Sequence, residues 1–153
     1  PREVLQTSSR PGGVYRKSSP AEQGRRSVYI FIKRSLIPPM MSTHDLADTD
    51  SSCAVRFTTT VPTQALTMIN SKFLNDQAGV FSSYLQKNAG DDVREKVSLA
   101  LSRVFCREPV KAEIDGCVKL IKEFQAEDKF SAEQAFKYFC LLSLNLNEFV
   151  YLD

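Results

Sequence analysis

The sequence has no apolar run long enough to cross a membrane. Its longest apolar stretches, such as residues 28–32 and 139–142, are four or five residues long, whereas a transmembrane helix needs about 20. Hydrophobic residues make up 42% of the 153-residue chain and charged residues 25%. This balance excludes a disordered polymer and is sufficient for one hydrophobic core. We therefore expect a globular protein without a transmembrane segment.

Metal-binding cysteine motifs are absent as well. Cys53, Cys106, Cys117 and Cys140 form no CxxC, CxxCH or paired Cys/His pattern, which zinc, iron–sulfur and covalent haem sites require. We therefore expect no cofactor in this segment. Three of the cysteines fall in expected helices, which favours buried free thiols; one disulfide among them is the alternative in an oxidising compartment. Cys53 should also be buried, and would be redox-active only if exposed beside Arg56.

Positive charge is concentrated at the beginning of the chain. Residues 1–40 contain eight Lys/Arg and two Glu, and residues 41–153 contain twelve Lys/Arg and sixteen acids, so balances of +6 and −4 give the net +2. A basic arm beside an acidic body could bind nucleic acid. However, no RNP, zinc-finger or aromatic-interleaved motif accompanies it. We expect no nucleic-acid partner and favour docking of the arm on its own body or on a neighbouring domain.

Apolar spacing predicts a mainly α fold, a bundle of about five helices. Pro62 suits the first turn of one helix, and Asp92 and Ser131 begin capping-box patterns that start two others. The helix after Ser131 is apolar around most of its circumference, so it should be the most buried. The apolar stripes of the expected helices cover residues 65–69, 73–85, 93–105, 114–124 and 135–146.

The first part of the chain lacks this helical periodicity. Residues 1–24 are rich in Pro, Gly and Ser, which predicts an extended arm or linker, and we expect residues 25–153 to form a single helical domain. Within it, residues 26–35 fit either a strand or a buried helix. A long irregular loop follows, at about residues 36–60, and loops of this length are usually functional or packed as an Ω-loop.

The loop collects one imidazole and three carboxylates within seven residues: His44, Asp45, Asp48 and Asp50. Oxygen ligands of this kind suit hard cations, but the loop lacks the central Gly and distal Glu of an EF-hand. The three aspartates are therefore weak metal candidates. His44 is a weak candidate general base, because no nucleophile is assigned to it.

Nearby arginines give the carboxylates an alternative role. Arg26, Arg34 and Arg56 could pair with Asp45 and Asp48, and we favour this salt-bridged loop over a metal site. The basic group formed by residues 25, 26, 33 and 34 could also bind a phosphate or carboxylate, although pairing with the loop acids would satisfy the same charges.

Several short motifs follow one another along the chain: RRSVY, KRS, SC-x-x-R, TTxPTQALTMIN and the terminal NEFVYLD. In this order they resemble the C-terminal domain of large secreted proteins found mainly in planctomycetes, the domain of unknown function 1553, from Tyr15 to Asp153. The resemblance departs at His44, where the family usually shows Phe, and at Val110, which replaces Thr and should leave a helix without a good cap.

The resemblance implies an exported, periplasmic or envelope-associated protein of which this chain is the C-terminal piece. Its partners would be upstream domains of the same polypeptide, and haem would be held elsewhere in the parent protein by a cytochrome c-like domain. The candidate polar cluster that unites the motif positions with the loop consists of Arg26, Arg34, Asp45, Asp48, Arg56, Gln64 and Asn70.

The residues and the resemblance together leave three candidate functions. The favoured one is a non-catalytic structural or interaction module. The second is part of a hydrolytic enzyme acting on extracellular polymer, with Asp45 and Asp48 as acid/base groups or metal ligands. The third, implied only by the family resemblance, is a partner of cytochrome c-like redox domains. Carboxylates that converge in a cleft with unpaired oxygens would favour hydrolysis, whereas buried carboxylates with both oxygens bonded to arginines would contradict a catalytic role and favour the module.

Overall fold

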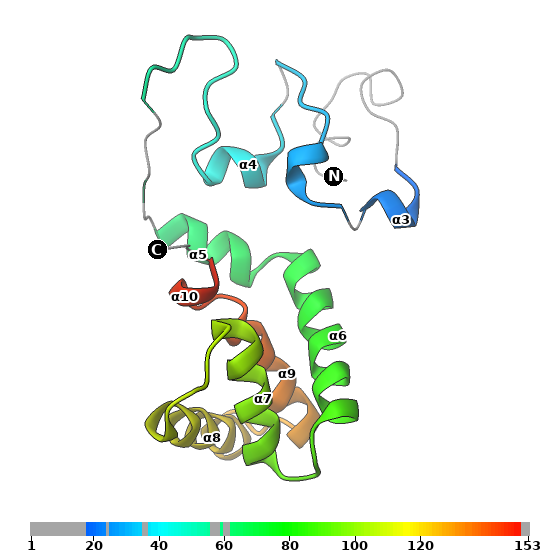
Figure 1. The fold of residues 1–153 in the computed structure, drawn as a ribbon, viewed down its shortest axis with the longest axis vertical. Helices are drawn as coiled ribbons and strands as arrows, with labels where there is room; N and C mark the ends of the chain where they lie inside the picture. Colours follow the sequence, from blue (N-terminus) through cyan, green and yellow to red (C-terminus); the bar gives the residue numbers. More distant parts are fainter. Residues whose placement is uncertain (1–17, 24, 35–36, 56–58, 60–61, 151–153) are drawn as a thin grey trace. The chain divides into compact units, whose positions relative to one another are not determined.

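The computed structural model describes residues 18–23, 25–34, 37–55, 59 and 62–150. Over these ranges the chain is mainly α-helical and forms no sheet (Figure 1), which confirms the expected fold class. The chain divides into two compact units, residues 1–64 and 65–153. This division lies within helix α5 (Pro62–Ile69). Most of the expected arm, residues 1–24, lies outside the described residues.

The first unit contains short elements only. Helix α3 (Pro20–Gln23) is followed by a 3-10 turn, η1 (Ser27–Tyr29), and then by helix α4 (Pro39–Thr43). Pro39 stands in the first turn of α4, where its missing N–H costs nothing. Because α4 lies inside the expected loop of residues 36–60, the irregular part of that loop is shorter than predicted.

The prediction of a strand or a buried helix over residues 26–35 is wrong. The segment forms η1 and then an irregular run, and Val28, Tyr29 and Phe31 are exposed. The physical reason is the arrangement of its apolar residues. They are consecutive rather than spaced at helical intervals, so a helix here would bury no single face.

The second unit is built from α6 (Lys72–Asn88), α7 (Val93–Phe105), α8 (Lys111–Ala126), α9 (Ala132–Ser143) and the short α10 (Asn147–Val150). Asp92 caps α7 by accepting a hydrogen bond from the N–H of Arg94 at 3.1 Å. Ser131 and Gln134 cap α9 reciprocally, as the sequence pattern predicted. No helix among the described ranges combines the length and hydrophobicity needed to span a membrane.

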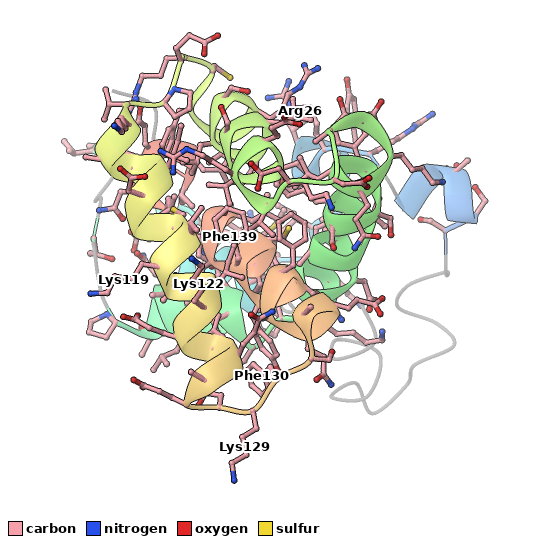
Figure 2. The ribbon with its side chains drawn as sticks, turned by 90° about the horizontal axis from the view of Figure 1, so that it is seen from below. Arg26, Lys119, Lys122, Lys129, Phe130 and Phe139 are labelled. Carbon is pink, nitrogen blue, oxygen red and sulfur yellow. The ribbon has the colours of Figure 1, made fainter. Side chains whose placement is uncertain are left out.

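Helix α9 is the centre of this unit, as expected. It packs against α6, α7 and α8, while α10 contacts α7. Figure 2 shows Phe139 of α9 in the middle of the helices, whereas Lys129, in the turn between α8 and α9, points away from them. Phe139 is 2% exposed. The buried core comprises Ala78, Leu85, Val97, Ala100, Leu101, Ile121, Ala135, Phe136, Phe139, Cys140 and Leu141.

Candidate functional site

The Asp45 carboxylate closes the loop that the sequence singled out. His44 ends α4, and Asp45 follows it with a left-handed backbone (φ 56°) that Asp tolerates better than most residues. Asp45 Oδ2 accepts a hydrogen bond from the backbone N–H of Thr59 at 2.7 Å, and the Thr59 hydroxyl donates to both carboxylate oxygens at 2.9 Å. The Asp45 side chain thus binds both the main chain and the side chain of Thr59, at the far end of the loop.

Gln64, at the start of α5, completes the closure. Its side chain is 5% exposed, and Nε2 donates to the Thr43 carbonyl at 3.1 Å, to Thr59 Oγ1 at 3.3 Å and to Asp45 Oδ2 at 3.4 Å. We call Thr43, Asp45, Thr59 and Gln64 the loop clasp. It contains two members of the candidate polar cluster, Asp45 and Gln64, and its two threonines were not predicted.

The clasp favours a charged carboxylate. The backbone N–H of Thr59 lowers the pKa of Asp45 most, followed by the Thr59 hydroxyl, and Gln64 and the neighbouring His44 add smaller effects in the same direction. Hydrogen-bond donors, rather than an arginine, therefore stabilise this anion among the described residues.

The Asp48 carboxylate accepts hydrogen bonds from residues of its own turn. Its Oδ1 accepts from the N–H of Asp50 at 2.9 Å and its Oδ2 from the hydroxyl of Ser51 at 2.7 Å. This is an Asx-turn, in which an Asp side chain replaces a backbone acceptor. The same two bonds, that from the Asp50 N–H first, lower the pKa of Asp48.

In the described ranges, Arg26 and Arg34 do not pair with Asp45 or Asp48 as expected. Arg34 contacts Asp50, with Nε 3.5 Å from Oδ1 and both side chains largely exposed. In the described parts of the chain neither Asp45 nor Asp48 forms an ion pair with Arg34 or Arg26. Arg56 lies outside the described residues. Among the described residues, the Asp45 carboxylate instead accepts hydrogen bonds from Thr59 and Gln64.

The weak catalytic and metal candidates do not converge. His44 Nδ1 lies 2.8 Å from the carbonyl of Met40, so the ring donates this hydrogen bond and holds the end of α4. The described residues contain no group of three or more His, Cys, Asp or Glu side chains placed to hold a metal ion. Asp45, Asp48 and Asp50 therefore remain separate carboxylates of one loop.

Asn70 belongs to the second unit, where it is exposed in the turn between α5 and α6. The residue that organises this turn is Asn75, which the sequence did not single out. Its Nδ2 donates to the carbonyls of Ile69 at 2.9 Å and Ser71 at 3.0 Å. The side chain of Asn75 thus joins the end of α5 to the beginning of α6.

Arg107 forms a second cluster that sequence reasoning missed. Its guanidinium binds Glu113 at the start of α8 and Glu148 in α10, each through a 2.7 Å contact. It also lies over the ring of Phe105, with Cζ 4.5 Å from the centroid. The two carboxylates raise the pKa of Arg107. No signal in the sequence marked this cluster, because the three charged residues are spread over forty-one positions and belong to different elements.

Glu113 also corrects the expectation that α8 lacks a good cap. Val110 cannot cap with its own side chain, but its backbone N–H donates to Glu113 Oε2 at 2.8 Å. This is half of a capping box, supplied from inside the helix. Arg107 and then the Val110 N–H lower the pKa of Glu113, and the charge suits the helix N-terminus.

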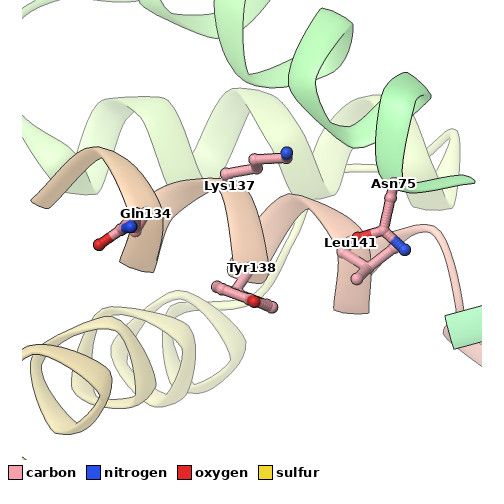
Figure 3. A pocket seen from close by; sticks show the side chains of 5 residues that line it. All are labelled: Asn75, Gln134, Lys137, Tyr138 and Leu141. Atoms are coloured by element: carbon pink, nitrogen blue, oxygen red, sulfur yellow. The ribbon is translucent and has the colours of Figure 1, made fainter. Parts of the chain in front are cut away.

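The hollows of the second unit are small or open. Figure 3 shows one between α6 and α9, with Asn75 on α6 and Gln134, Lys137, Tyr138 and Leu141 on α9; its volume is about 150 Å³. Ligand pockets usually measure about 300–1,000 Å³. A larger, shallow hollow of about 440 Å³ lies over Phe105 and residues 145–148. Neither contains a nucleophile paired with a base.

The four cysteines are free thiols, but they are not all buried. Cys53 is exposed, which overturns its expected burial. Cys106, which follows α7 and has a left-handed backbone conformation, is also exposed. Cys140 is buried, and burial raises its pKa to about 12. Burial, with a smaller effect from Glu113, raises the pKa of the half-buried Cys117. The two helical thiols are therefore poor nucleophiles.

Comparison with known proteins places the chain in context. No curated protein and no solved structure matched it. One family model matches residues 3–121, which is more than half of the chain and includes the loop clasp. The match begins before the expected Tyr15 and ends within α8, at residue 121. The chain therefore belongs to the family described as PSD1, protein of unknown function (DUF1553).

Proposed function

We propose that this chain is a non-catalytic interaction module of a large exported, envelope-associated protein, and that it packs against other domains of the same polypeptide. The observation that carries the proposal is the bonding of the loop carboxylates. Asp45 is bound to Thr59 and Gln64, and Asp48 to Asp50 and Ser51. These bonds order the loop, which supports a structural role for both carboxylates.

A candidate surface for such packing is the outer stripe of α6, which we define as Phe73, Val80 and Tyr84. These residues lie on one side of the helix, away from the core residues Ala78 and Leu85. Phe73 is 57% and Val80 63% exposed. Exposed apolar side chains aligned along one side of a helix are typical of interaction surfaces. The family resemblance supplies the proposed occupant, a companion domain of the parent protein.

Binding in trans tests the interaction. The chain is mixed with the companion domains of its parent protein, and affinity is measured by calorimetry for the native sequence and for Val80→Asp. We expect Val80→Asp to weaken binding at least tenfold, a loss of about 1.4 kcal/mol, because a carboxylate would be buried against an apolar surface. Gln125→Asp, at an exposed position of α8, is the charge-matched control and should leave the affinity unchanged.

The hydrolytic alternative makes a different prediction. Asp45→Asn and Asp48→Asn would abolish any polymer hydrolysis by the full-length protein while leaving the circular dichroism spectrum unchanged. If either variant abolished such an activity without loss of fold, the non-catalytic proposal would be wrong. We expect instead that any hydrolysis by the parent protein is the same for both variants.

A further inference from the structure

Four consecutive large apolar side chains are exposed at the turn η1 and just after it. Val28 is 76%, Tyr29 71%, Ile30 37% and Phe31 68% exposed. We call these four residues the apolar apex. Exposing one such side chain is ordinary, but a contiguous group marks a surface that meets an apolar environment.

Cations flank the apolar apex on both sides. Arg25 and Arg26 precede it, Lys33 and Arg34 follow it, and no acidic residue occurs between Glu22 and Asp45. Arg25 lies over the Tyr29 ring, with Cζ 5.9 Å from the centroid. Asp50 reaches Arg34, but that contact of 3.5 Å is between largely exposed groups and is therefore weak. The segment thus presents apolar side chains within a strongly positive surface.

The pattern of exposure distinguishes between two kinds of apolar environment. A groove on a protein that accepts an extended segment takes alternate side chains, because successive side chains point to opposite sides. Here neighbouring residues are exposed without alternation. A lipid surface can surround side chains on every side, and aromatic and basic residues are both favoured at its boundary with water.

We propose that residues 25–34 bind the surface of an anionic lipid bilayer. The apolar apex enters the boundary between headgroups and acyl chains, and Arg25, Arg26 and Arg34 contact lipid phosphates. The charge of the segment fits this partner, because anionic bilayers attract basic segments beside an apolar anchor. This function is additional to packing through the outer stripe of α6 and uses a different unit of the chain.

Cosedimentation with vesicles tests the electrostatic part. The full chain is mixed with vesicles of phosphatidylcholine alone, or of phosphatidylcholine with phosphatidylglycerol. We expect binding to the mixed vesicles only, with a marked loss between about 0.1 M and about 1 M salt, where the Debye length falls from about 10 to about 3 Å. Equal binding to both vesicles, or to neither, would overturn the proposal.

Charge variants locate the contact. Each Lys or Arg near an anionic surface raises the membrane-binding constant about fivefold. The double variant Arg25→Gln, Arg26→Gln should therefore lower this constant about 25-fold. Lys119→Gln with Lys122→Gln, which removes the same charge from α8, is the matched control and should change it little. Circular dichroism checks that both variants fold. An equal loss from the two pairs would show nonspecific charge attraction and would contradict the proposed site.

Tryptophan fluorescence tests insertion. The sequence contains no Trp, so Phe31→Trp places a single reporter in the apolar apex. Its emission should shift to shorter wavelength on adding mixed vesicles. Phe73→Trp, at a similarly exposed position of α6, should not shift. An emission shift of the Trp at residue 73 alone would assign the lipid contact to the outer stripe of α6 instead. If the chain bound acidic proteins but no vesicles, the proposal of a lipid partner would be refuted.

Discussion

The Asp45 carboxylate binds the backbone N–H of Thr59 at 2.7 Å, across fourteen residues of chain. Together with Gln64, this contact joins the end of α4 to the residues before α5. Ordering such a loop costs conformational entropy, and the described residues of the first unit include few buried apolar side chains to offset that cost. Hydrogen bonds of the loop clasp therefore have an unusually large share in fixing its structure.

Replacing Gln64 by Ala should open the loop clasp. Gln64 is buried, and its loss leaves the Thr43 carbonyl and Thr59 hydroxyl without this donor, which should destabilise the local structure by about 1–3 kcal/mol. Hydrogen exchange of the Thr59 amide measures the effect and should become faster. Gln77→Ala, at an exposed site of α6, is the control. Unchanged exchange at Thr59 in the Gln64 variant would show that the clasp does not hold the loop.

Acid should open the same clasp. The pKa of Asp45 in the folded chain lies below its ordinary value of 3.8, chiefly because of Thr59. A depressed carboxyl pKa contributes stability that is complete above the unfolded value and is lost as the pH falls through the folded value. The Thr59 amide chemical shift should therefore be constant from neutral pH to about 4 and change below it. Asp45→Asn should remove this titration, and Asp48→Asn should leave it in place.

Helices α6 to α9 were predictable because the sequence signals that specify them lie within each helix or at its ends. Apolar residues recur at helical spacing, and Asp92 and Ser131 mark two beginnings that the structure confirms. The central position of α9 was predictable for the same reason, since apolar residues such as Phe136 and Phe139 cover much of its circumference.

The clasp and the Arg107 cluster could not be predicted in this way. Thr59 and Gln64 reach Asp45 through hydrogen bonds between residues far apart in sequence, and such bonds leave no periodic signal. Arg107 meets Glu148 forty-one residues away. Opposite charge suggested that arginines would bind Asp45 and Asp48, but among the described residues the backbone N–H groups of Thr59 and Asp50 donate to these carboxylates instead.

Arg107→Lys should loosen α10 from the rest of its unit. Arg107 binds two carboxylates with a planar guanidinium, whereas an ammonium cannot reproduce both forked contacts. We expect faster hydrogen exchange in residues 147–150 and little change in the core of α9. Arg103→Lys, at an exposed position of α7, is the matched control. Equal protection of α10 in both variants would show that apolar contacts alone hold this helix.

Replacing either of two glycines inside helices by alanine should stabilise the protein. A Cβ added at Gly116 of α8 meets no heavy atom within 4 Å, and one added at Gly79 of α6 meets only Lys137 Cε, at 3.8 Å. Because Gly loses more backbone entropy on folding than Ala, Gly116→Ala and Gly79→Ala should each raise the free energy of unfolding by about 0.5–1 kcal/mol. Denaturant unfolding followed by circular dichroism measures this change, and the two effects should add in the double variant because the sites share no contact. A lower free energy of unfolding for Gly116→Ala would mean that α8 packs against something at this open face.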